Sequence, residues 1–152
     1  MLDKKILPLF NFALGSKLLH FEPVELKFDL NETEKVVGNI QVLNYTRTTS
    51  IKFFTNSDIT RTFNNNIPAA LGDYTDADIT IVDRNNQIIV KNLPISTLQF
   101  DNNALKFLAL DLPFVEVDWT RTKIRRYNNN APVVFYFGVF YIKNSEFENL
   151  IK

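Results

Sequence analysis

The sequence predicts an all-β protein, a single β-sandwich of about eight strands with a jelly roll as the first choice of topology. Turn-forming residues recur roughly every 8 to 12 residues along the chain. Several short segments alternate between apolar and polar residues, and no amphipathic helix of normal length interrupts them. An immunoglobulin-like sandwich is the second choice, because the Cys and Trp landmarks of immunoglobulin domains are missing.

Length and composition are those of one soluble domain. The chain has 152 residues, and a domain of about 150 residues buries about 70% of its unfolded surface, enough for its own core. It has no Cys, which excludes disulfides, Fe–S clusters and Cys-ligated zinc. Seventeen basic residues balance 17 acidic ones, so no net field attracts nucleic acid or an anionic membrane.

Residues 1–21 are expected to form an apolar arm, or a first strand, ahead of a sandwich domain at 22–152. Their apolar residues follow neither a helical nor a strand period. Lysines before an apolar run superficially resemble a signal peptide, but Pro8 interrupts the run and no cleavage site follows. We expect no signal peptide, and an arm that docks through Phe10 and Phe12 on its own domain or on a neighbour.

The first half of the sandwich begins with strict alternation over 24–30, which predicts a strand with one face in water. A second strand is expected over 36–45, with Gly38 as a bulge. Two shorter strands, at 51–55 and 59–63, follow on either side of a turn.

The second half begins with a surface loop over 64–78 that contains a brief helical turn at 68–71. Two hairpins follow, and then a long strand over 114–126. The hairpins pair 79–82 with 87–91, and 95–100 with 104–110.

The segment 131–142 carries apolar residues on both of its alternating sets, so as a strand it must be covered on both faces. We expect it at the centre of a sheet beneath a loop or the arm, or at the centre of a subunit interface. Gly138 lies amid bulky aromatics and permits close approach of a ring or backbone, so Gly138→Val is expected to disrupt folding or assembly. A helical turn over 145–151 closes the chain.

No catalytic motif stands out. His20 is the only histidine, which excludes a histidine-rich metal centre, and no nucleophile motif accompanies it. Glu116 and Asp118 on one strand are more typical of solvated surface than of a glycosidase pair. The aspartates of 73–83 do not follow the order of an EF-hand loop. We expect no enzyme, no catalytic residue, no cofactor and no metal.

Arg121, Lys123 and Arg125 form a basic ladder, because on one extended strand they share a face with Trp119. Such a ladder can hold phosphates or stacked bases, pair with acidic residues of a neighbouring subunit, or be plain solvated surface. At zero net charge, a subunit contact or solvated surface is favoured over nucleic acid.

The chain has no Cys and is rich in Asn and Phe. It carries an apolar arm at 4–21, a cleanly alternating strand at 24–30 and a doubly apolar strand at 131–142. In this pattern the chain resembles the single jelly-roll structural proteins of icosahedral viruses, in particular small capsid or vertex (penton) proteins of tailless bacteriophages. The resemblance implies a virion subunit, made in the host cytoplasm, that assembles with itself and with other capsid proteins. The expected assembly is closed and symmetric, with a pentamer first in line. The expected subunit contacts are Phe10, Phe12, Arg121, Lys123, Arg125 and Gly138.

The alternative is a carbohydrate- or protein-binding β-sandwich, such as an adhesin or accessory domain. Modules of this kind display aromatic side chains on one face or loop set, for which Tyr74, Trp119 and Tyr127 are the candidates. Nucleic acid is not an expected partner, and contact of the arm with a membrane stays open.

Overall fold

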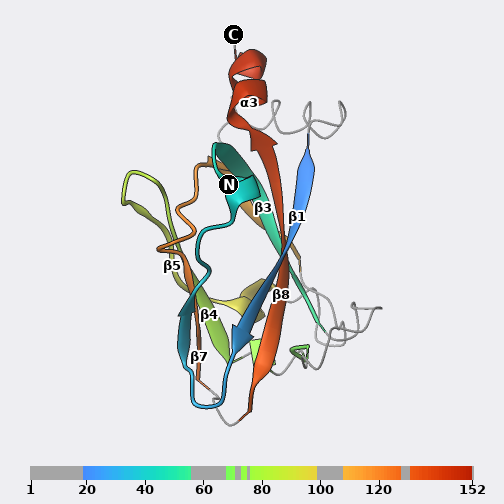
Figure 1. The fold of residues 1–152 in the computed structure, drawn as a ribbon, viewed down its shortest axis with the longest axis vertical. Helices are drawn as coiled ribbons and strands as arrows, with labels where there is room; N and C mark the ends of the chain where they lie inside the picture. The colour runs from blue at the N-terminus through green and yellow to red at the C-terminus, as the bar shows by residue number, and fades with distance from the viewer. Residues whose placement is uncertain are drawn as a thin grey trace.

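The computed structural model is a two-sheet β-sandwich that ends in one helix (Figure 1). It describes residues 19–55, 68–70, 73, 74, 76–98, 108–127 and 131–151. The all-β sandwich is therefore confirmed. No helix in these ranges is long and apolar enough to span a membrane. The elements in chain order are β1 (His20–Phe28), β2 (Glu34–Val36), η1 (Gln41–Leu43), β3 (Thr46–Phe54), β4 (Ala77–Val82), β5 (Ile88–Pro94), η2 (Ile95–Leu98), β6 (Leu110–Val115), β7 (Lys123–Arg126), β8 (Val133–Lys143) and α3 (Asn144–Ile151).

In the part of the chain that the structure describes, each sheet has four strands, and the strand pairs are nested. Sheet A has the order β1-β8-β3-β6 and sheet B the order β2-β7-β4-β5. The nested antiparallel pairs are β1 with β8, β2 with β7, β3 with β6 and β4 with β5. Further pairing of β8 with β3 and of β7 with β4 joins these pairs into sheets.

Strand β8 lies inside sheet A and supplies the middle of the core. Phe135 and Phe137 are fully buried between the sheets. Phe135 stacks on Tyr74 with ring centroids 4.8 Å apart, and Phe137 contacts Phe53 at 5.6 Å. Truncation of a buried Phe to Ala typically costs about 3–5 kcal/mol, so these rings account for much of the core's stability.

The opposite face of β8 is also covered, as the sequence predicts. Val134 and Ile142, which point away from the core, are buried. The segment at 68–70 lies beside the first residues of β8, where Pro68 forms a parallel bridge with Val134 and the amide of Ala69 donates to the Val134 carbonyl at 2.9 Å.

A buried arginine joins two turns at one end of the sandwich. Arg126 donates to the carbonyls of Asp29, Glu32 and Ala131 at 2.8, 2.7 and 2.7 Å. Its guanidinium lies 4.9 Å from the centre of the Phe28 ring. Burial lowers the pKa of Arg126. The side chain thus connects the β1–β2 turn to the connection before β8.

Several predicted strands have other bounds. β1 begins at His20 rather than at residue 24, because pairing with β8 continues to Tyr141. The strand expected over 36–45 is wrong: β2 ends at Val36, Gly38 adopts a left-handed φ of +92°, and η1 follows. The strand expected to start at residue 95 is wrong too, since η2 begins there.

The long strand expected over 114–126 is also wrong. β6 ends at Val115 and β7 starts at Lys123. A turn separates them, in which the amides of Arg121 and Thr122 donate to the Asp118 carbonyl at 3.2 and 3.0 Å. The strand expected over 59–63, and Phe10 and Phe12 in the arm, lie outside the described residues.

Candidate functional site

Three aromatic side chains meet on the outer face of sheet A. Phe21 of β1 lies next to Phe140 of β8, with ring centroids 4.9 Å apart, and 6.3 Å from Phe54 of β3. Phe21 is 45% exposed, and the other two rings are half-buried. We call these three residues the aromatic patch. Grouped apolar rings at the surface are typical of interaction sites.

Gly138 lies beneath the ring of Phe21. It pairs with Pro23 of β1 and with Lys52 of β3. A Cβ at this position would fall 2.0 and 2.5 Å from two ring atoms of Phe21 and 3.1 Å from the ring of Phe54. The absent side chain therefore makes room for a ring, which is what the sequence predicts for Gly138.

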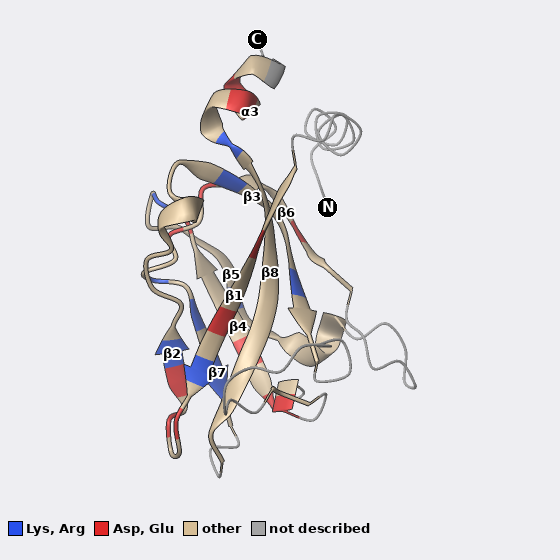
Figure 2. Ribbon diagram, turned by 45° about the vertical axis from the view of Figure 1, so that its right-hand side comes forward, with Lys and Arg blue, Asp and Glu red and all other residues tan. Residues whose placement is uncertain are grey.

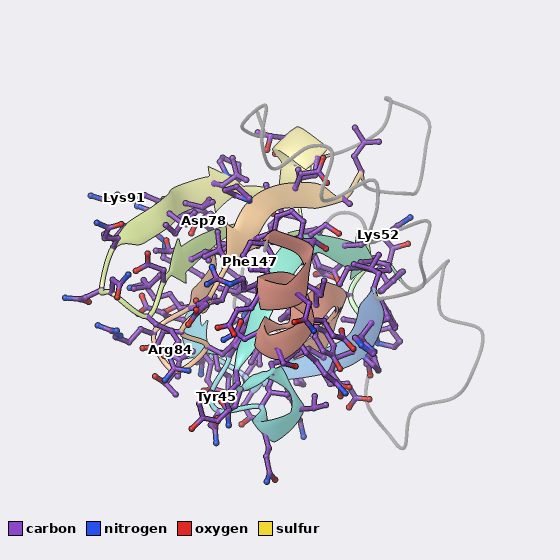
Figure 3. All side chains as sticks on the ribbon, turned by 90° about the horizontal axis from the view of Figure 1, so that it is seen from above. Tyr45, Lys52, Asp78, Arg84, Lys91 and Phe147 are labelled. Carbon is purple, nitrogen blue, oxygen red and sulfur yellow. The ribbon has the colours of Figure 1, made fainter. Side chains whose placement is uncertain are left out.

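Charged side chains of both signs border the aromatic patch. Glu25 and Lys27 are exposed on the same face of β1, and Lys52 lies on β3. β8 itself carries no charge before Lys143, and its ribbon is tan along most of its length (Figure 2). Seen from above, Lys52 lies on the opposite side of the molecule from Lys91 of β5 (Figure 3).

The outer face of sheet B carries the two ladder cations together with the exposed apolar residues Val36 and Ile88, and both cations are paired within the chain. Lys123 lies 3.0 Å from Glu34 of β2. Arg125 Nη2 donates to Asp78 Oδ2 at 2.9 Å and to the Tyr127 hydroxyl at 2.8 Å, and that hydroxyl donates to the same carboxylate. The hydrogen bond to Asp78 raises the pKa of Arg125. Both cations therefore have acidic partners within the chain itself, without a neighbouring subunit.

The third ladder residue does not share their strand. Arg121 lies in the turn before β7, where its Nε donates to Asp118 Oδ2 at 2.8 Å and its Nη1 donates to Asn86. The other oxygen of Asp118 accepts the amide of Thr120 at 3.0 Å as well as its hydroxyl. The Thr120 hydroxyl, and after it Arg121, lowers the pKa of Asp118. The prediction of one extended basic face is wrong for Arg121, because the turn redirects it.

Glu116 and His20, which the sequence analysis considers as catalytic candidates, lie near the C-terminal helix. Glu116, which does not share a strand face with Asp118, lies 3.2 Å from Arg47, whose guanidinium is 4.5 Å from the centre of the Phe147 ring. His20 stacks on Tyr141 at 5.2 Å, and its Nε2 is 3.4 Å from Glu146. His20 thus contacts α3 directly, whereas Glu116 contacts Arg47, which packs on Phe147 of α3.

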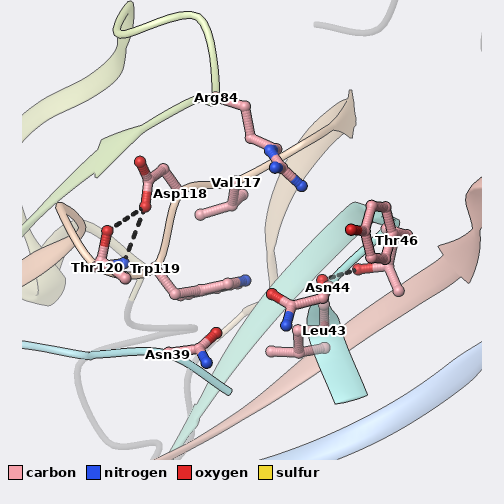
Figure 4. Close-up of a pocket in the computed structure, with 10 residues that line it drawn as sticks. Asn39, Leu43, Asn44, Thr46, Arg84, Val117, Asp118, Trp119 and Thr120 are labelled. Carbon is pink, nitrogen blue, oxygen red and sulfur yellow. Dashed lines mark hydrogen bonds between the residues drawn. The ribbon is translucent and has the colours of Figure 1, made fainter. Parts of the chain in front are cut away.

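A cleft opens between three loops at the end of the sandwich that carries α3 (Figure 4). The loops are 37–45, 83–87 and 116–122, and the cleft has a volume of about 180 Å³. We call it the loop cleft. Its lining includes Asn39, Asn44, Tyr45, Arg84, Asp118 and Trp119.

The aromatic candidates for carbohydrate binding are distributed differently from the prediction. Tyr74 is fully buried and Trp119 is only 5% exposed, so the prediction that they form an exposed face is wrong. Tyr127 is 64% exposed. Sequence reasoning missed Tyr45, which is 74% exposed at the loop cleft with a left-handed φ of +59°. Its only sequence signal was an aromatic residue beside Asn44 in a segment predicted as strand.

The described residues include no group of three His, Cys, Asp or Glu side chains placed to hold a metal ion. The aspartates weighed for calcium hold turns instead. Asp73 accepts the amide of Ala70 at 2.8 Å, and Asp83 Oδ1 accepts the amides of Asn85 and Gln87 at 2.9 and 2.8 Å.

Comparison of the chain with protein-family models, with curated proteins and with solved structures finds no match. Function is therefore argued from the geometry of the chain itself.

Proposed function

We propose that the protein is a structural subunit that assembles with copies of itself, most specifically a capsid or vertex (penton) subunit of a tailless icosahedral bacteriophage. The observation that carries this proposal is the contrast between the two sheets. Sheet B has an outer face whose charges are paired within the chain, whereas sheet A presents the aromatic patch. Self-assembly gives that patch a partner, and it requires no catalytic group.

The topology supports the same proposal, in which we assign the sandwich to the jelly rolls. Four nested strand pairs are what a long hairpin produces when it is rolled around a core, and they yield two sheets of four strands. Jelly rolls build viral capsid domains as well as lectins. A sandwich of this kind provides a rigid body with loops at both ends for contacts with neighbours.

The occupant proposed for the aromatic patch is a second copy of this chain. Glu25 and Lys52 at its border can pair with charges of opposite sign on a second copy. Covering the exposed 45% of Phe21 would remove roughly 90 Å² of a ring of about 200 Å², which is worth about 2 kcal/mol. A stable interface buries about 800 Å² per partner, so the proposal assigns the remainder to the arm with Phe10 and Phe12 and to loops outside the loop cleft.

Sedimentation velocity at increasing protein concentration tests the proposal. We expect closed oligomers for the wild type, pentamers first, and a shift toward monomers for Phe21→Lys and after deletion of residues 1–18. Ile88→Lys is the matched control, since Ile88 is an exposed apolar residue on β5 of sheet B. A wild type that stays monomeric at the highest concentration, or equal effects of Phe21→Lys and Ile88→Lys, would count against the proposal. Circular dichroism of each variant establishes that it is folded.

A further inference from the structure

We propose that the loop cleft binds a neutral saccharide and accommodates one pyranose ring. This binding function goes beyond self-assembly, because it uses the loops at one end of the sandwich and not the outer face of sheet A. It rests on an indole N–H that faces the cleft, an exposed aromatic ring in an unfavourable backbone conformation, and a cleft lining that both donates and accepts hydrogen bonds.

The donor is the indole N–H of Trp119, which faces the loop cleft. The side chain lines the loop cleft and is 5% exposed, and its ring packs on Phe137 with centroids 6.3 Å apart. Among the described residues, no hydrogen bond to this N–H is found, although the indole can only donate. Figure 4 shows the ring nitrogen at the end of the side chain, toward Asn44. An N–H that faces the cleft can donate to a ligand oxygen bound there.

The exposed ring is Tyr45. Its φ of +59° is unfavourable for a bulky residue. Strained positions of this kind concentrate at functional sites. The Tyr45 carbonyl accepts the amide of Asn144 at 3.0 Å, and the Arg84 guanidinium lies 5.7 Å from the ring centre. In Figure 3 the side chains of Tyr45 and Arg84 lie next to each other. The ring thus has a fixed backbone, a cation beside it and an accessible apolar surface, onto which the C–H groups of a sugar can stack.

The cleft lining carries charges of both signs and groups that donate and accept hydrogen bonds. The ionisable groups of opposite charge in its lining are Arg84 and Asp118, and the hydrogen bond from Thr120 lowers the pKa of Asp118, which keeps it ionised at neutral pH. Arg84 and the indole donate, Asp118 accepts, and the amides of Asn39 and Asn44 do both. Hydroxyl groups also donate and accept, so a polyol matches this mixed lining better than a carboxylate or phosphate does.

The size of the cleft limits the ligand. Its volume of about 180 Å³ is below the roughly 300–1,000 Å³ typical of sites for drug-sized molecules. One sugar ring fits this room, and the rest of a glycan would extend into solvent between the loops.

Trp119 is the only tryptophan of the chain, so its fluorescence and its single indole N–H resonance report on the cleft directly. The full chain would be titrated with the methyl α-pyranosides of glucose, mannose and galactose and with methyl β-N-acetylglucosaminide. We expect one of them to shift both signals saturably, with Kd on the order of 1 mM. Tyr45→Ala and Arg84→Ala should each weaken binding about tenfold or more, the effect of losing roughly 1.4 kcal/mol of binding free energy.

Tyr127→Ala is the matched control, because Tyr127 is also exposed and lies under an arginine, Arg125, at 5.2 Å. It should leave the titration unchanged. If Tyr45→Ala does not fold, the loss of sugar binding is measured with Arg84→Ala and Tyr45→Asn instead. The proposal is overturned if no sugar shifts the indole resonance at about 100 times that Kd, if the cleft variants bind as the wild type does, or if sulfate produces the saturable shift and the sugars do not.

Discussion

Replacing Gly138 with alanine tests whether the aromatic patch depends on the missing side chain beneath Phe21. The new Cβ would fall 2.0 Å from a ring atom of Phe21, so the ring has to move. Phe21 lies at the surface and can rotate outward, whereas β8 is held by β1 and β3 on its two sides. We therefore expect a displaced ring, with loss of its contacts to Phe54 and Phe140, and a milder effect on folding than a clash in the core would have. Gly138→Val should act in the same way and more strongly.

The size of the expected loss in the free energy of unfolding follows from the buried part of Phe21. With 45% of the residue exposed, roughly 110 Å² of a ring of about 200 Å² is buried, which is worth at most about 2.7 kcal/mol. Alanine in a strand gains about 0.5–1 kcal/mol over glycine. The net expectation is that Gly138→Ala lowers the free energy of unfolding by about 1–2 kcal/mol. In a Phe21→Ala background only the 3.1 Å approach to the Phe54 ring remains, so the same substitution should raise the free energy of unfolding by at most about 0.5–1 kcal/mol.

The assay is urea denaturation of the four proteins of this double-mutant cycle, followed by Trp119 fluorescence and far-UV circular dichroism. Measurements at several protein concentrations separate folding from assembly. Gly38→Ala serves as the control glycine, because its cost comes from a φ of +92° with open space around it, and it should be additive with Phe21→Ala. The reasoning is refuted if Gly138→Ala is as stable as the wild type, or if its coupling to Phe21→Ala is below about 0.5 kcal/mol.

Three further predictions concern stability. Arg126→Met should lower the free energy of unfolding by about 3 kcal/mol, because three backbone carbonyls lose a charged donor. Arg126→Lys should recover only part of that loss. Urea denaturation measures both variants, and a loss below about 0.5 kcal/mol for Arg126→Met would contradict this role. Tyr45→Asn should stabilise the chain by about 1 kcal/mol, since Asn tolerates a φ of +59°. The midpoint of thermal unfolding should therefore rise by about 2–4 °C. An unchanged or lower midpoint would argue against backbone strain at Tyr45. Asp118 has a pKa lowered by folding, so its stabilisation is complete above about pH 4 and is lost as the pH falls through the folded pKa. The advantage of the wild type over Asp118→Asn should therefore shrink on acidification, and denaturation across pH 2–7 that finds a constant difference would contradict it.

The parts of the fold that could be predicted are those whose signal is local. Residues 131–142 carry a doubly apolar pattern, and the strand they form is covered on both faces. The hairpin of β4 and β5 follows from two apolar runs around a turn at 83–87. The break between β6 and β7 could not be read in this way, because Val117 and Trp119 continue the alternation through the turn. After β6 the chain leaves sheet A, and Val117 forms a bridge with Asp83 at the end of β4. The turn at Asp118 then follows, held by hydrogen bonds with Thr120 and Arg121, and an alternation pattern shows neither step.

The candidate sites depend more on contacts that are distant in sequence. Gly138 could be singled out because its neighbours along the strand are aromatic. The acidic partners of Lys123 and Arg125 could not, because Glu34 and Asp78 reach them only through the register of β7 with β2 and β4. Tyr45 was missed since its exposure follows from the path of the loop after η1.

The two proposed surfaces use different parts of the same subunit. The aromatic patch lies on the outer face of sheet A, whereas the loop cleft lies among loops 37–45, 83–87 and 116–122. In Figure 3, Lys52, which borders the patch, is on a different side of the molecule from Tyr45 and Arg84 of the cleft. Contact between copies through sheet A would therefore leave the cleft open to solvent. A coat subunit that also attaches to surface glycans needs this separation, and an assembled wild type should then bind sugar with the same affinity per chain as a monomeric Phe21→Lys variant.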